Sequence, residues 1–184
     1  MTTKNLVYTA LMTAIIAVLG LVPPIPLPGI PVPIVLQNMG VFLAGILLGR
    51  KYGALSVIVF LLLVVAGAQI LPGARGGIGV FASPSAGFLI MYPVVAYGVG
   101  LLRDKWLHKV TAWRLFIAVF LVGVVLLDLV GSIIMGMIMN VDIKTSLKGM
   151  FLFYPGDIIK AIIASLIGAS MLRHSKFKQL LNLK

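Results

Sequence analysis

The sequence predicts an all-α integral membrane protein, a single transmembrane domain whose six helices form a bundle with both termini in the cytoplasm. Of its 184 residues, 61% are hydrophobic and only 10% are charged, whereas soluble proteins average about 25% charged residues. Six apolar runs have roughly the length of ~20 residues that crosses a bilayer. These runs occupy most of the chain, so we expect no soluble catalytic domain.

The six predicted helices are joined by short polar, proline-rich or glycine-rich segments. They cover about residues 5–22, 35–49, 54–71, 85–102, 115–139 and 153–172. The first run has the position of a signal peptide, but its basic region is only Lys4, no small-residue cleavage site closes it, and more apolar runs follow. We therefore expect it to be the first transmembrane helix.

Two connections on one side of the predicted bundle have unusual compositions. Residues 23–34 contain six prolines and no charge, and we expect no regular helix there because proline lacks an N–H donor and has a fixed φ. Residues 72–79 are rich in glycine and carry one charge, Arg75. Irregular backbone at membrane depth must be buried in protein or line a cavity. These segments and the start of the last helix are therefore expected to cap a pocket together.

Lysine and arginine are distributed asymmetrically over the two sides of this topology. Eleven of the fifteen lie on the termini and on the second and fourth connections, whereas three lie on the opposite side. The eleven are Lys4, Arg50, Lys51, Arg103, Lys105, Lys109, Arg114, Arg173, Lys176, Lys178 and Lys184, and the three are Arg75, Lys144 and Lys148. Cytoplasmic segments carry the excess of basic residues, which places both termini inside. Because these charges form no single stripe, the sequence predicts a bilayer protein and not a nucleic-acid-binding one.

Asp157 and Lys160 are the first candidate pair for ligand binding. They lie three positions apart, on one face of the last helix, directly after the Tyr154-Pro155-Gly156 break. A urea or amide group of a substrate would accept from the ammonium and donate to the carboxylate. The alternative is that Asp157 caps the helix and Lys160 extends outward to the headgroups. Spacing alone does not distinguish the two.

Arg75 and the glycines after it form the second candidate. A guanidinium binds a carboxylate through two hydrogen bonds, and Gly77 and Gly79 would let the backbone approach a ligand closely. A phosphate-binding loop is the competing interpretation, but no Gly-Lys-Ser/Thr sequence follows and no strand is expected before it. An ordinary arginine in an outer loop is the other alternative.

Asp128 is the third candidate because it falls near the centre of the fifth helix. A charge there costs at least about 2.5–3.5 kcal/mol on insertion scales, so it must pair, bind a proton or face water. Lys160 and Arg75 are its possible partners. Gln37 and Asn38, which open the second helix, would either donate to a ligand or satisfy backbone groups of the proline-rich segment.

The sequence argues against most membrane enzymes and against a metal site. It has no cysteine and no glutamate, and its four aspartates, at positions 104, 128, 142 and 157, are too widely spaced to suggest a metal cluster. We therefore predict no enzymatic activity, no metal and no cofactor. A proton-coupled exporter that uses Asp128 remains an alternative, as does a structural subunit of a larger complex.

Small residues on the first helix suggest a contact with another protein. Ala10 and Ala14 are four positions apart, a spacing that lets two membrane helices approach closely. The pattern is weak by itself, because alanine is common in transmembrane helices.

Several motifs, in order along the chain, resemble the biotin transporter family BioY, whose members are the substrate-binding S components of energy-coupling factor (ECF) transporters. The most specific are a Pro-Val-Pro-x-x-Leu-Gln element and a Gly-Asp-x-x-Lys element. The matching segments are Ile30 to Gln37, Leu43 to Gly49, Gly76 to Gly79, Ser83 to Ile90 and Gly156 to Ala161. The family usually has Gly-Pro-Thr-Gly-Gly-Tyr where this chain has Ser83 to Phe88, and Asp128 has no counterpart in the pattern.

This resemblance implies high-affinity biotin binding and uptake across the cytoplasmic membrane of a prokaryotic cell. It implies that Asp157 and Lys160 bind the ureido ring, that Gly77 and Gly79 bring the loop to the ligand, and that the segment between the first two helices closes the pocket. The implied partners are a transmembrane scaffold subunit, held through Ala10 and Ala14, and two cytoplasmic ATPases that hydrolyse ATP.

Overall fold

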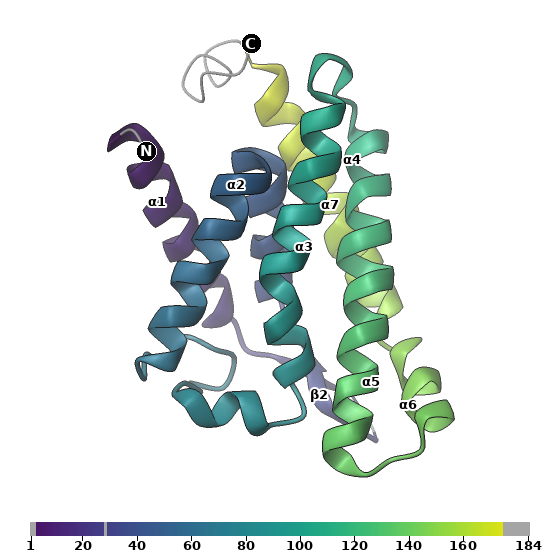
Figure 1. Ribbon diagram of the computed structural model, residues 1–184. Helices are drawn as coiled ribbons and strands as arrows, with labels where there is room; N and C mark the ends of the chain where they lie inside the picture. Colours follow the sequence, from purple (N-terminus) through teal and green to yellow (C-terminus); the bar gives the residue numbers. More distant parts are fainter. Residues whose placement is uncertain (1–2, 28, 175–184) are drawn as a thin grey trace.

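The computed structural model describes residues 3–27 and 29–174 and shows a bundle of helices with a small β-hairpin at one end (Figure 1). Five helical stretches are long and apolar enough to cross a membrane. They are α1 (Thr3–Gly20), α2 (Gln37–Val65), α3 (Ala86–Lys105), a continuous stretch (Ala112–Met139) made of α4 (Ala112–Ala118), a π-helical segment (Val119–Leu126) and α5 (Leu127–Met139), and α7 (Tyr154–Arg173). Of the eleven basic residues used above to predict orientation, Lys176, Lys178 and Lys184 lie outside the described residues.

Helix α2 is broken in its middle by Gly49. This residue has φ 73° and ψ −176°, a backbone conformation that is not helical. A Cβ added to Gly53 would lie 2.6 Å from the carbonyl oxygen of Ala44, although nine positions along a straight helix span about 13 Å. The two halves of α2 therefore fold back on each other as a helical hairpin, and the break coincides with the predicted end of the helix over 35–49.

The second half of α2 ends six residues before the predicted boundary at residue 71. Gly67 has φ 101°, and its N–H donates to Val64 O at 3.0 Å while Ala68 N–H donates to Leu63 O at 3.0 Å. These bonds form a Schellman motif, in which a left-handed glycine satisfies the last carbonyls of a helix. The prediction of a helix over 54–71 overlooked this stop signal.

The proline-rich segment contains the one departure from an all-α fold in the described residues. Strands β1 (Ile25–Leu27) and β2 (Ile30–Ile34) pair in an antiparallel hairpin, with Ile25 opposite Ile34 and Leu27 opposite Ile30. Prolines occur in both strands, which a two-stranded sheet tolerates because each strand has a free edge. The predicted absence of a regular helix from this segment is confirmed, and the mostly helical fold carries a small hairpin that the sequence did not predict.

The polar connection after α5 also contains structure that the sequence reading left undefined. Asn140, in a left-handed conformation, ends α5, and the Asp142 side chain accepts from Lys144 N–H at the start of α6 (Ile143–Met150). Two short 3₁₀ turns, Ile78–Ala82 and Leu107–Lys109, complete the described elements. In Figure 1, β2, α6 and the turn after α2 lie at one end of the bundle, and the start of α1 and the end of α7 lie at the other.

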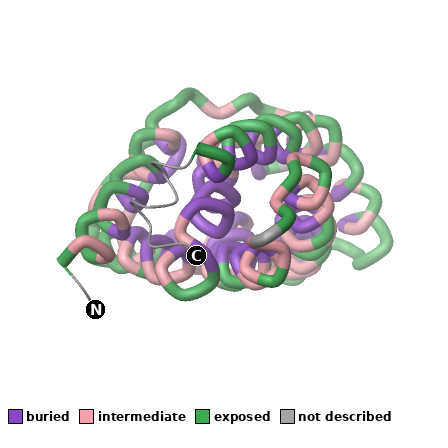
Figure 2. The backbone as a smooth tube through the Cα atoms, turned by 90° about the horizontal axis from the view of Figure 1, so that it is seen from above, coloured by how far each residue is buried: buried purple, intermediate pink, exposed green. Residues whose placement is uncertain are grey.

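The buried residues lie mainly toward the interior of the bundle, and the exposed residues lie mainly on its outside (Figure 2). Many of the exposed residues are large and apolar. On α1, for example, Leu6, Leu11, Ile15 and Val18 are exposed, whereas Met12 and Ile16 are buried. A soluble protein would not expose so much apolar surface on a long helix. Lipid is the solvent that fits this distribution.

Candidate functional site

A pocket opens at the end of the bundle that carries the β-hairpin. The empty space between its walls, including the open solvent at its mouth, is about 550 Å³. Its walls come from β2 and the residues after it, the turn after α2, and the pocket-side ends of α2, α3, α5 and α7. The lining residues are Val32, Pro33, Ile34, Val35, Gln37, Asn38, Leu71, Pro72, Arg75, Ser85, Phe88, Leu89, Tyr92, Leu127, Asp128, Phe153, Asp157 and Lys160.

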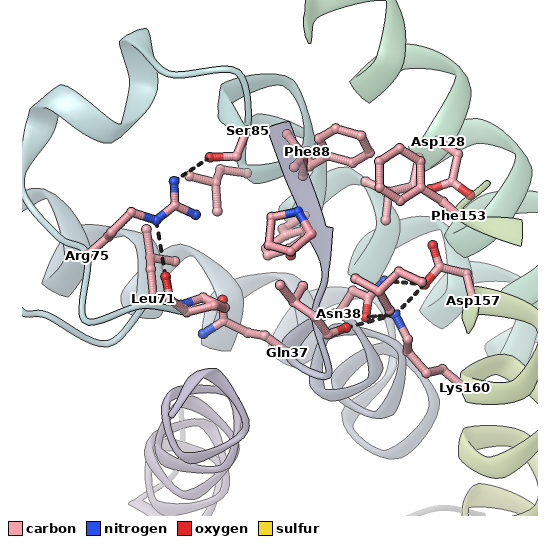
Figure 3. A pocket seen from close by; sticks show the side chains of 18 residues that line it. Gln37, Asn38, Leu71, Arg75, Ser85, Phe88, Asp128, Phe153, Asp157 and Lys160 are labelled. Carbon is pink, nitrogen blue, oxygen red and sulfur yellow. Dashed lines mark hydrogen bonds and ion pairs between the residues drawn. The ribbon is translucent and has the colours of Figure 1, made fainter. Parts of the chain in front are cut away.

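Three polar side chains form a connected cluster on one wall of this pocket (Figure 3). Lys160 Nζ forms an ion pair with Asp157 Oδ1 and donates to Asn38 Oδ1 at 3.1 Å, and Asn38 Nδ2 donates to Asp157 Oδ1 at 2.9 Å. Lys160 Nζ also donates to the carbonyl oxygen of Val35 at 2.7 Å. The cluster therefore links the start of α7 to the start of α2 and to the end of the hairpin segment.

The burial of this cluster excludes one alternative for Asp157 and Lys160, while their role in ligand binding remains a prediction. Only 4% of Asp157 and 5% of Lys160 is exposed. The prediction that they share one face of a helix is confirmed, and the alternative, that Lys160 extends outward to the headgroups, is wrong. Because α7 begins at Tyr154 with Pro155 next to it, Asp157 lies in its first turn, where the helix dipole favours a negative charge.

Gln37 and Arg75, both predicted as ligand groups, line the pocket but also hold the backbone around it. Gln37 Nε2 donates to Ile16 O at 3.2 Å and to Ile70 O at 2.9 Å, and its Oε1 is buried without a partner in the described residues. Arg75 Nε donates to Pro72 O at 3.1 Å, and one of its terminal nitrogens donates to Ser85 Oγ at 3.4 Å. Arg75 thereby places a cation on the wall opposite Asp157, as Figure 3 shows.

Gly77 and Gly79 lie beside the pocket and do not belong to its wall. Gly77 has φ 84°, and its N–H donates to Val64 O at 2.7 Å. A Cβ at either glycine would meet no atom within 4 Å. In this structure Gly77 positions the loop, and the predicted contact of both glycines with a ligand remains a prediction.

Asp128 enters the pocket from α5 and has neither of the partners predicted for it. It is 1% exposed, yet among the described residues it forms no ion pair with Lys160 or Arg75, and its Oδ2 has no hydrogen-bond partner. Figure 3 shows its carboxyl group facing Asp157. Asp128 is therefore a buried polar group of the pocket that the protein itself leaves incompletely satisfied.

Aromatic and aliphatic side chains make up the rest of the wall, and sequence reasoning did not assign them to the site. The rings of Phe88 and Phe153 pack edge to face with centroids 5.6 Å apart, and Tyr92 and Leu89 are buried beside them. Such residues are indistinguishable in sequence from the apolar filling of any transmembrane helix. The arrangement suits a ligand with one polar face, one apolar body and an anionic group near Arg75.

The other predicted features lie away from the pocket. Ala10 and Ala14 are both exposed on α1, as a helix-contact face requires. In the described part of the chain no three His, Cys, Asp or Glu residues gather into a possible metal site.

A family model described as the BioY family matches residues 1–177 of this chain. The chain belongs to the BioY family. The resemblance stated from the motifs is thereby confirmed, and with it the assignment to a family of transporters and not of enzymes.

Curated relatives in the BioY family cover nearly the whole chain. The probable biotin transporter BioY of Bacillus subtilis is 44% identical over 163 residues, 89% of this chain and 87% of that protein. The biotin transporter BioY of Rhizobium etli is 40% identical over 177 residues, 94% of this chain and 95% of that protein.

A crystal structure of the S-component for biotin from an ECF-type ABC transporter has the same fold. It is 40% identical to this chain, the superposition has a TM-score of 0.92, and 98% of this chain and 99% of that chain are covered. Membership and fold together identify this protein as a helical membrane protein of the S-component type.

Proposed function

We propose that this protein binds biotin in the pocket described above and takes it up as the S component of an ECF-type transporter. The observation that carries the proposal is the buried cluster of Asp157, Lys160 and Asn38 on the pocket wall. A protein that needed only a stable fold would rarely keep an ion pair inside a membrane bundle, because apolar residues of similar volume are usually as stabilising.

The chemistry of biotin matches the distribution of groups in the pocket. Its urea ring needs donors for the carbonyl oxygen, which Lys160 and Asn38 supply, and an acceptor for a ring N–H group, which Asp157 supplies. Its sulfur-containing ring and aliphatic chain suit the apolar wall formed by Phe88 and Phe153. Its carboxylate suits the guanidinium of Arg75, which forms charge-assisted hydrogen bonds with such groups.

The fold supports six membrane crossings, although the described residues contain five long helical stretches. The break at Gly49 turns α2 into two antiparallel segments, so α2 crosses twice. The start of α1 and the end of α7 lie at the same end of the bundle in Figure 1, as an even number of crossings requires. The basic residues gather toward that end, which we assign to the cytoplasm. The pocket then faces outward, on a multi-pass protein of a prokaryotic cytoplasmic membrane.

An S component needs an energy source that this chain does not contain. We propose that it associates with a transmembrane scaffold subunit and two cytoplasmic ATPases, and that the exposed face of α1 with Ala10 and Ala14 contacts the scaffold. The alternative function, a proton-coupled exporter, requires Asp128 to act as the residue that binds and releases the coupled proton. Membership of a family whose curated members are named biotin transporters favours uptake.

The proposal is tested by measuring biotin binding to the detergent-purified protein by calorimetry and by thermal shift. Biotin in micromolar excess should raise the melting temperature, because a ligand that binds only the folded state stabilises it by mass action. Lys160→Ala should abolish the shift. Lys148→Ala is the matched control, because Lys148 is exposed on α6. This variant should bind biotin as the unchanged protein does. Absence of any shift with the unchanged protein would contradict the proposal.

A further inference from the structure

Asp128 is a buried pocket residue for which the fold has no evident use. Only 1% of it is exposed and its Oδ2 has no partner in the described residues. Lys160 already binds Asp157, Asn38 and Val35, and Arg75 binds Pro72 and Ser85. A buried polar atom without a partner destabilises the folded protein, so a leucine at this position would suit the fold better than the aspartate does.

Local helix geometry brings this side chain to the pocket. The eight residues Val119–Leu126, directly before α5, are π-helical. A π-helical segment turns the residues after it relative to a regular α-helix, and such segments are frequent at functional sites. Asp128 follows two positions later and lines the pocket beside Leu127. In Figure 3 an oxygen of Asp157 points toward the Asp128 carboxyl group, so two acceptors from α5 and α7 face the same space.

A cyclic urea presents one carbonyl oxygen and two N–H donors on its two flanks. In the pocket, Lys160 and Asn38 supply the donors, and Asp157 supplies an acceptor for one ring N–H. Of the two partnerless acceptors that line the pocket, Gln37 Oε1 and Asp128 Oδ2, Asp128 lies beside Asp157 (Figure 3). The unpaired oxygen of Asp128 has the chemistry that the second ring N–H needs. We propose that Asp128 is a specificity-determining residue that accepts a hydrogen bond from the second ring N–H of the bound urea. This inference rests on the proposed function.

The first test separates binding from folding with the variant D128L. If Asp128 serves the ligand, D128L leaves the melting temperature of the ligand-free protein unchanged or raises it, while biotin binds about tenfold or more weakly. The variant D128N keeps a carbonyl acceptor and should bind biotin more tightly than D128L does. A D128L protein with a lower ligand-free melting temperature and undiminished biotin affinity would assign Asp128 a structural role and overturn the proposal.

The second test uses the two cyclic carbamates in which one ring N–H of biotin is replaced by oxygen. The unchanged protein should discriminate against both analogues. D128L should lose most of the discrimination against one of them and keep the discrimination against the other, whose missing N–H faces Asp157. Equal discrimination by the unchanged protein and by D128L against both analogues would refute a contact between Asp128 and the ring.

These outcomes are distinct from failure of the proposed function. If the unchanged protein does not bind biotin, the proposed function is wrong and this inference falls with it. If the unchanged protein binds biotin, Lys160→Ala abolishes binding and D128L binds biotin as tightly as the unchanged protein, only the role of Asp128 is wrong.

Discussion

The two ends of the bundle each contain a cluster of cations and carboxylates, and the clusters differ in what they bind. At the end that holds the start of α1 and the end of α7, Arg103 donates to Asp104 Oδ1 at 2.8 Å and to Leu47 O at 3.2 Å, and Asp104 Oδ2 accepts from Arg50 N–H at 3.3 Å. We call Arg50, Arg103 and Asp104 the terminal cluster. These contacts surround the Gly49 turn and hold it to the end of α3. At the other end, Asp157, Lys160 and Asn38 line a pocket.

Exposure and unsatisfied atoms separate the two clusters further. Asp104 is 32% exposed at its side chain, so water shares its charge, whereas Arg103 is 2% exposed. The cluster combines side-chain ion pairs of Asp104 with Arg103 and Arg50 and hydrogen bonds to backbone atoms. At the pocket Asp128, Asp157 and Lys160 are almost wholly buried, whereas Arg75 is exposed. Both Gln37 Oε1 and Asp128 Oδ2 lack partners in the described residues. The terminal cluster leaves only the N–H of Arg103 Nε unpaired. We infer that the terminal cluster serves the fold and the pocket cluster serves a ligand.

The largest expected effect comes from replacing both Asp157 and Lys160 by leucine. Biotin binding should fall by at least about 100-fold, because the charged hydrogen bonds to the urea are lost. The free energy of unfolding should stay the same or rise, because apolar replacement of a buried pair is often neutral or stabilising. Calorimetry and thermal unfolding measure the two quantities. Loss of both binding and stability would show that this cluster, too, serves the fold.

Arg103→Leu should produce the opposite pattern. It removes the bonds to Asp104 and Leu47, so the free energy of unfolding should fall by about 2 kcal/mol, less than for a fully buried pair because Asp104 is partly exposed. The biotin dissociation constant should change by less than about threefold. The same two measurements apply. A large change in biotin affinity would show that the two ends are not independent.

Gly49→Ala should destabilise the protein by a smaller amount. Gly49 has φ 73° and ψ −176°, a region of backbone conformation that is essentially restricted to glycine, and a residue with a Cβ there is strained by at least about 1 kcal/mol. The added Cβ would also lie 2.8 Å from Asp104 Oδ1. Thermal unfolding should show this loss with biotin affinity unchanged, and a melting temperature equal to that of the unchanged protein would contradict a tight turn at Gly49.

The smallest effect on the isolated protein is expected from Ala10→Leu with Ala14→Leu. Both residues are exposed on α1, and neither belongs to the pocket wall or to a charged cluster. Stability and biotin affinity should therefore remain as they are. Co-purification with the scaffold subunit should be lost, because larger side chains prevent close helix approach. Retention of the complex would exclude this face of α1 as the contact.

The features that sequence predicted well are those with a direct signal in residue type and spacing. Long apolar runs identified the helices, and the spacing of Asp157 and Lys160 placed both on one face. The β-hairpin was missed because the prolines that exclude a helix do not exclude a two-stranded sheet. The early end of α2 was missed because Gly67 is a stop signal only in the left-handed conformation that tertiary structure reveals.

The pocket wall could not be predicted because its residues look like ordinary membrane-helix residues. Phe88 and Phe153 come together only when α3 and the start of α7 pack. The position of Asp128 depends on the π-helical segment before it, for which the sequence has no recognisable signal. The lack of a partner for Asp128 Oδ2 in the described residues is a property of packing and required the three-dimensional structure.

The central claim is that the pocket cluster binds biotin, and a crystal structure of the protein crystallised with biotin tests it most directly. We predict electron density for the urea ring within hydrogen-bonding distance of Lys160, Asp157 and Asn38, with the carboxylate near Arg75. Biotin bound at another site, or an empty pocket at a biotin concentration that saturates binding in solution, would contradict the account.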